Sequence, residues 1–172
     1  MQELAQLKER LEQERPVSWQ ELPDLALYMD QVISYMPRQL IRFGEEELLT
    51  SAMVNNYIKD GVVPRAEGKR YGPTHLGYLT AVCAMKKVLP VKDIRVLFDA
   101  VPEGKQPGDI YDYFTRALDT ALTETARTLD PELEEADLPK LALQLALRSY
   151  ADQLACARIL DVIRERSQPT KK

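Results

Sequence analysis

The chain has 172 residues, of which 45% are hydrophobic and 29% are charged, as in an ordinary globular protein. No stretch approaches the roughly 20 apolar residues of a membrane-spanning helix, and the charged opening segment is unlike a secretory signal peptide. The two cysteines, Cys83 and Cys156, are too few for a disulfide framework, which is typical of a reducing cytoplasm. We therefore expect a mainly helical, cytoplasmic protein that does not contact a membrane.

The net charge of −4 conceals an uneven distribution along the chain. Residues 1–49 carry 5 basic and 10 acidic side chains, and residues 96–172 carry 10 basic and 14 acidic ones. Residues 50–95 between them carry 8 basic and only 3 acidic side chains. A local basic segment is typical of nucleic-acid binding even where the whole chain is acidic.

The N-terminal part of the chain predicts two helices and a loop. An amphipathic helix, with Leu4, Leu7 and Leu11 on one face, is expected to end before Pro16. Ser18 and Glu21 have the spacing of a capping box. Apolar residues at helical spacing predict a second helix from about Asp24 to Met36. Residues 37–47 have no clear period and predict a loop or a short turn.

The central segment predicts a short helix followed by a hairpin. Thr50 is a good N-cap for a helix over Ser51–Asp60, and Gly61 is a good left-handed C-cap. The residues from Val62 to Tyr71 predict two very short strands around a glycine-containing turn. Pro73 then suits the first position of another helix, with Gly72 as its cap.

The C-terminal half predicts three more helices and one linker. A short helix is expected after Pro90, and the composition of Val101–Gly108 is that of a linker. The apolar spacing predicts a helix over residues 109–129 and a long one over residues 138–166. Because the apolar surface of the long helix is wide, we expect it to occupy the centre of a bundle or to pair with a second chain.

This order of elements is what a winged helix-turn-helix needs, with one helix for the major groove and a basic loop for phosphates. Asn55 and Asn56 are the candidates for reading adenine, with Ser51 and Lys59 nearer the DNA backbone. On the hairpin, the expected phosphate contacts are Arg65, Lys69 and Arg70. The alternative is that both asparagines are simply solvated on an exposed face. Tyr57 shares the apolar stripe of its helix and is expected in the core.

The run LTSAMVNNYIKDGVVPRAEGKRYGPTHLGYLTAVCAMKKVLPVKDIRVLF resembles the DNA-binding half of the MerR family of bacterial transcription regulators. Tyr57 and Gly61 match the end of that family's recognition helix, and Arg70 with Tyr71 matches the basic-tyrosine tip of its wing. Leu76 matches the next helix, and the last helix of the pattern is matched by Val91, Ile94 and Leu97. The resemblance implies that Tyr71 belongs with the DNA-binding residues.

A narrower resemblance covers about residues 20–99. The phrases LYMDQVISYM, LTSAMVNNYIKDG and KRYGPTHL are similar to an uncharacterised bacterial family, a domain of unknown function regarded as MerR-like. The chain departs from MerR where Asn55 and Asn56 replace the usual arginine, where residues 37–47 replace a tight turn, and where no simple long dimer helix follows the wing. This resemblance supplies no effector, and an effector of unknown kind stays open.

These observations predict a mainly α fold with a MerR-like winged helix-turn-helix, a small β-hairpin wing and a C-terminal helical dimerisation region. The expected organisation is an N-terminal helix over residues 1–20, the winged domain over 21–100, a linker over 101–108 and the helical region over 109–172. The predicted function is that of a bacterial transcription regulator, a homodimer on double-stranded DNA with a near-palindromic operator. The alternative is a helical protein–protein interaction module that does not bind DNA.

Of the functions considered, catalysis has the least support in the sequence. No carboxylate pair, nucleophile motif or phosphate loop is found, so no enzyme, cofactor or metal is expected. His75, the only histidine, has no second histidine for metal binding. The aromatic residues of the C-terminal part could line a small-molecule pocket or could simply be packing; they are Tyr111, Tyr113, Phe114 and Tyr150.

Overall fold

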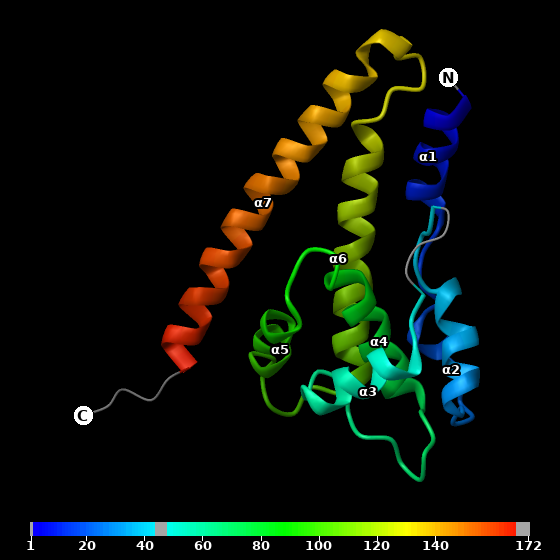
Figure 1. The fold of residues 1–172 in the computed structure, drawn as a ribbon, viewed down its shortest axis with the longest axis vertical. Helices are drawn as coiled ribbons and strands as arrows, with labels where there is room; N and C mark the ends of the chain where they lie inside the picture. Colours follow the sequence, from blue (N-terminus) through cyan, green and yellow to red (C-terminus); the bar gives the residue numbers. More distant parts are fainter. Residues whose placement is uncertain (1, 44–47, 168–172) are drawn as a thin grey trace.

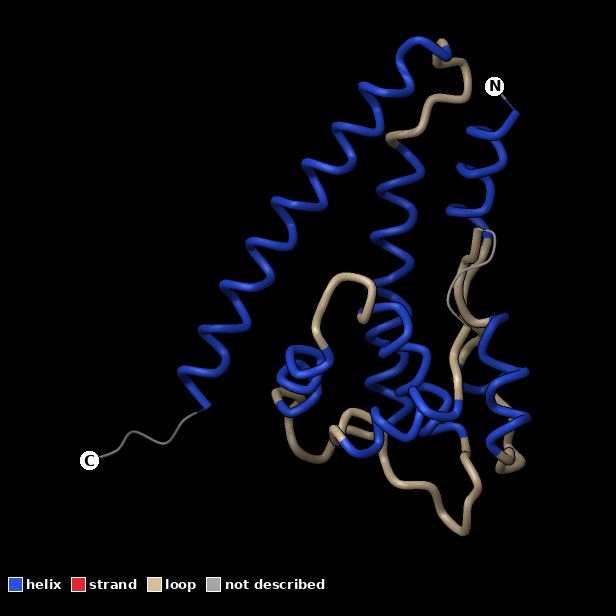
Figure 2. Tube along the Cα trace, viewed as in Figure 1, coloured by secondary structure: helices blue, strands red, loops and turns tan. Residues whose placement is uncertain are grey.

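The computed structural model describes residues 2–43 and 48–167, and within them the chain forms seven α-helices and no β-strand (Figures 1 and 2). The mainly helical class expected from the sequence is confirmed. The helices are α1 (Gln2–Gln13), α2 (Met29–Tyr35), α3 (Ser51–Lys59), α4 (Pro73–Met85), α5 (Val91–Asp99), α6 (Pro107–Arg127) and α7 (Leu138–Ser167). Three 3-10 turns supplement them: η1 (Trp19–Glu21), η2 (Met36–Arg38) and η3 (Glu135–Asp137).

The second helix begins later than expected, at Met29 instead of Asp24. The reason is a pairing with a distant segment, because the backbone N–H and C=O of Leu27 bond with those of Tyr71 at 2.9 Å in both directions. This pairing holds the chain extended up to the N-cap of α2. Leu25, which looks like part of the apolar helix face in the sequence, is 77% exposed. Of the expected loop over residues 37–47, residues 44–47 lie outside the described part.

The two short strands expected between Val62 and Tyr71 are wrong for the described chain, which has only isolated bridges there, Leu27 with Tyr71 and Glu67 with Arg70. The N–H groups of Val62 and Val63 both donate to the C=O of Tyr57, at 3.0 and 3.3 Å. They close the end of α3 and are therefore not free to pair with a second strand. A β-hairpin wing with regular strands is not found.

The core is built around α4. Its side chains Leu76, Leu79 and Val82 are fully buried, and helices α2, α3 and α5 contribute Val32, Val54 and Ile94 to the same cluster. Helix α6 packs against both α1 and α4. Because α4 is surrounded by other elements, it is apolar on nearly every side, as expected for a central helix.

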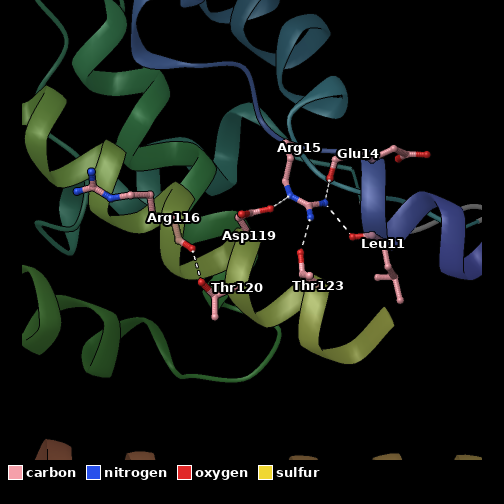
Figure 3. Close-up of polar contacts among 7 residues, drawn as sticks. All are labelled: Leu11, Glu14, Arg15, Arg116, Asp119, Thr120 and Thr123. Atoms are coloured by element: carbon pink, nitrogen blue, oxygen red, sulfur yellow. Dashed lines mark hydrogen bonds and ion pairs between the residues drawn. The ribbon is translucent and has the colours of Figure 1, made fainter. Parts of the chain in front are cut away.

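Arg15 joins the end of α1 to α6 (Figure 3). Its guanidinium donates to the Asp119 carboxylate at 2.6 Å and to the Thr123 hydroxyl at 3.1 Å, both on α6. The same group donates to the backbone carbonyls of Leu11 and Glu14 at 2.8 Å. Carbonyls at a helix C-terminus lack helical partners, so one side chain both caps α1 and ties it to its neighbour.

Helix α7 leaves the other helices instead of entering a bundle (Figure 1). It has 30 residues, and only Leu160 among them is buried. The contacts of its C-terminal half are polar as well as apolar: Arg164 pairs with Asp93 at 2.6 Å, and Gln153 donates to the C=O of Val88 at 3.1 Å. The bundle-centre alternative is therefore excluded. No helix in residues 2–43 and 48–167 combines the length and apolarity that crossing a membrane requires.

Candidate nucleic-acid interface

Both ends of α3 are fixed by local hydrogen bonds, as the sequence predicts. The hydroxyl of Thr50 accepts the N–H of Met53 at 3.2 Å, which makes Thr50 an N-cap. Gly61 has a φ of +74°, and the N–H of Val62 donates to the C=O of Tyr57 at 3.0 Å. This is the pattern of a Schellman C-cap, in which glycine provides the left-handed residue. The helix therefore has defined limits on both sides.

The two faces of α3 differ sharply. Val54 and Tyr57 are buried in the core, so the prediction that Tyr57 is a core residue is confirmed. The opposite face is exposed and contains the four side chains expected there, Ser51, Asn55, Asn56 and Lys59. Since the apolar face fixes the rotation of the helix, the two asparagine amides are directed to solvent. They can donate and accept hydrogen bonds from that position.

The loop after α3 ends in a tight two-residue turn. Gly68 and Lys69 have φ values of +57° and +65°, and the backbone groups of Glu67 and Arg70 bond to each other at 3.1 and 3.0 Å. Two central residues with positive φ are typical of a type I′ turn. The expected glycine turn is thus present even though regular strands are not. It presents Lys69 at the tip, exposed to solvent.

The base of this loop is held by His75, which is buried near the start of α4. Its Nδ1 accepts the N–H of Gly72 at 3.1 Å, and its Nε2–H donates to the C=O of Arg65 at 3.0 Å. These two partners define a neutral ring with its hydrogen on Nε2. The Tyr71 ring meets the imidazole edge to face, with the ring centres 5.5 Å apart. His75 is thus a positioning residue for the loop.

Two of the predicted residues are already engaged within the chain. Tyr71 is only 5% exposed and belongs to the core cluster, so its ring is not on the surface of the loop. The Arg70 guanidinium donates to the Tyr28 hydroxyl at 2.8 Å and lies 4.7 Å from the centre of that ring. Tyr28 is half-exposed and was not singled out from the sequence, because only the Leu27–Tyr71 pairing brings it to the loop.

The other cations of this surface are free of such contacts. In the described residues, the side chains of Lys59, Arg65 and Lys69 form no ion pair or hydrogen bond. Seven of the eight predicted DNA-binding residues, all except Tyr71, thus lie exposed on α3 and the loop that follows it. This surface is at the end of the molecule away from the α6–α7 connection (Figure 1). Free cations beside exposed amides can bind a polyanion.

Arg95 of α5 contacts the C-terminal end of α3. Its guanidinium donates to the C=O of Asp60 at 3.1 Å, where the last turn of α3 leaves its carbonyls unpaired. It also lies against Gly61, where a Cβ atom would come within 3.2 Å of its nitrogen. No sequence pattern points to Arg95, because its contact spans 35 positions.

A family model described as Domain of unknown function (DUF1836) matches residues 17–114, which is more than half of the chain. The match includes η1, α2 to α5 and the start of α6, and therefore the whole candidate interface. No curated protein and no solved structure matches the chain. The protein belongs to the DUF1836 family.

Proposed function

We propose that this protein is a bacterial transcription regulator that binds double-stranded DNA through α3 and the loop over residues 61–71. The observation that carries the proposal is the division of α3 into one face locked in the core and one face of exposed amide, hydroxyl and ammonium groups. Asparagine is a poor helix former, so two adjacent asparagines in the middle of α3 cost a few tenths of a kcal/mol each, and a binding role would explain that cost. The proposed arrangement is a MerR-like helix-turn-helix in which the irregular loop takes the place of the wing.

The dimensions of α3 suit the major groove. An α-helix with its side chains is about 10–12 Å across, and the groove is about 12 Å wide, so the nine residues of α3 can lie in it. Asn55 and Asn56 on its exposed face can each donate to and accept from one adenine edge. Lys59 at the end of the helix would then contact a phosphate.

The loop supplies the contacts to the DNA phosphates, which do not depend on the base sequence of the DNA. Lys69 at its tip and Arg65 at its base are free cations, so each phosphate contact adds a salt-dependent share of affinity. The loop has fixed ends, because His75 bonds to Arg65 and Gly72 while Tyr71 is paired with Leu27. The loop backbone that carries these cations is therefore fixed at both ends without regular strands.

The proposed regulator is a homodimer whose second copy covers the outer face of α7. Five large apolar side chains on this helix are 55–60% exposed, Ile159 among them. The other four follow one another at a spacing of 4, 3 and 4 residues, which is that of a coiled-coil seam. They are Leu143, Leu147, Tyr150 and Leu154. A second α7 supplies an identical seam, which satisfies the symmetry of a dimer. Two symmetric copies would read a near-palindromic operator.

The test compares single variants on a selected duplex and on a random duplex. Binding sites are first selected from genomic fragments with the purified protein. Asn55→Ala and Asn56→Ala are expected to reduce discrimination between the two duplexes by about 1 to 3 kcal/mol. Lys69→Ala is expected to weaken both duplexes alike and to lower the salt slope by about 1. Lys140→Ala, which changes an exposed lysine on α7, is the matched control.

Equal losses on both duplexes for the asparagine variants would remove the base-reading role. Absence of duplex binding at about 50 mM salt, where phosphate contacts are strong, would instead favour the second candidate function, a helical protein-interaction module. That candidate is favoured by the exposed apolar seam of α7 and by the acidic flanks of the chain.

A further inference from the structure

An apolar pocket of about 270 Å³ lies between α4, α5 and α6, beside η1. Aromatic rings from all four elements border it, and the Tyr78 and Phe98 rings meet edge to face with their centres 5.0 Å apart. Of the aromatic residues singled out from the sequence, Tyr111, Tyr113 and Phe114 border the pocket, while Tyr150 lies elsewhere on α7. The pocket is close in size to the smaller ligand sites of proteins.

Small residues line the pocket beside the aromatic rings. Gly77 and Ala81 face it from α4, and Ala117 faces it from α6. The Trp19 ring closes one side by lying directly on two glycines, since a Cβ atom on Gly77 or Gly108 would come within 3.3 or 2.9 Å of it. The flat Trp19 ring thus forms one wall of the pocket, and a planar ring of a ligand can stack on such a wall.

The chemistry of the lining selects an apolar ligand. The pocket lining is almost wholly apolar, built mainly from aromatic and aliphatic side chains, so water finds few hydrogen-bond partners inside. A more polar hollow adjoins it and shares Leu97, Ile110 and Tyr113 with it. That hollow carries charges of both signs: Lys105, Asp109, Asp112 and Arg116. A ligand would thus place its apolar rings in the pocket and any polar substituent in the adjoining polar hollow.

We propose that this pocket is a binding site for a compact, planar aromatic molecule of about two fused or linked rings. The inference goes beyond DNA binding and stands without it. The ligand would contact Phe98 of α5, the helix whose Arg95 also holds the C=O of Asp60 at the end of α3. The pocket is therefore one helix away from the proposed reading surface, where an effector could act.

The experiment uses the full chain and the neutral fluorescent probe prodan, a planar molecule built on two fused rings. Trp19 is the only tryptophan and lies in the pocket wall, so a bound probe is expected to quench tryptophan emission and to become fluorescent itself by energy transfer. Saturation is expected at one probe per chain. Ala117→Phe fills the pocket from a residue that is exposed, and it is expected to weaken probe binding at least tenfold. Ala121→Phe, one turn further along α6 and outside the lining, is the control.

Probe binding that leaves Trp19 emission unchanged would overturn the proposal. So would equal probe affinity for Ala117→Phe and the wild-type chain, or a loss of binding in Leu147→Ala, which would place the probe on the outer face of α7 instead. Quenching of Trp19 in the wild-type chain needs no variant to fold. None of these outcomes depends on DNA, so failure of the pocket and failure of the DNA proposal remain distinguishable.

Discussion

Helices α4 and α7 show how differently two apolar helices of one chain can be used. Helix α4 has 13 residues, and seven of them are buried. Helix α7 has 30 residues and buries only Leu160. Burial of apolar surface is the main favourable term in folding, so α4 contributes far more stability per residue than α7 does. What α7 keeps exposed is a surface available to a partner.

The largest effect is expected where α4 is most buried. Leu79→Ala removes a fully buried side chain from the centre of the core and is expected to lower the free energy of unfolding by about 2 to 5 kcal/mol. Urea unfolding followed by circular dichroism measures it. Leu25→Ala makes the same chemical change at a side chain that is 77% exposed. If both variants lost the same stability, α4 would not be the centre of the fold.

Burial of Tyr111 on α6 makes the stability of the fold depend on pH. Burial raises the pKa of Tyr111 to about 12, and its hydroxyl donates to the C=O of Val17 at 2.8 Å. The pKa of an unfolded tyrosine is about 10. The contribution of Tyr111 is therefore complete below pH 10 and is lost as the pH rises from about 10 to 12. A shift of this size corresponds to about 2 to 3 kcal/mol.

Tyr111→Phe is expected to flatten the loss of stability between pH 10 and 12, as measured by thermal unfolding at a series of pH values. Tyr150→Phe on α7 is the control, because that side chain is 60% exposed and is expected to leave the wild-type profile in place. An unchanged profile in Tyr111→Phe would show that other groups cause the alkaline loss.

A smaller and local effect is expected where α7 meets α5. Leu160→Ala removes the only buried side chain of α7, and the loss is expected to be about 2 kcal/mol. Since no other side chain of α7 is buried, the C-terminal half of α7 should separate from α5. Hydrogen exchange is then expected to rise in residues 150–167 and to stay unchanged in α4. Faster exchange throughout the chain would mean that α7 and the core unfold together.

Local signals in the sequence predicted much of this fold. The caps of α3, Thr50 and Gly61, act through neighbouring residues, so sequence spacing was enough to find them. The start of α2 was missed because Leu27 pairs with Tyr71, 44 positions away. The wide apolar surface of α7 was visible, but whether it was central or exposed depended on tertiary packing.

The candidate site divides in the same way. Helical period placed Asn55 and Asn56 on the exposed face of α3, opposite Val54 and Tyr57. The residues that hold the loop and the end of α3 could not be found by spacing, since His75 and Arg95 act on backbone carbonyls of other elements. The resemblance to MerR predicts that Tyr71 contacts DNA. The structure instead buries its ring, because its backbone pairs with Leu27.

The smallest effect on folding is expected on the outer face of α7, and it separates stability from assembly most clearly. Leu147 is 58% exposed in the single chain, so Leu147→Ala is expected to change the unfolding free energy of the monomer by less than about 0.5 kcal/mol. The same change removes a central residue of the proposed seam and should shift the sedimentation equilibrium toward monomer. Ala146→Ser, a change beside the seam, is expected to leave association intact. A wild-type chain that sediments as a monomer at all concentrations would mean that the exposed seam does not serve a second copy.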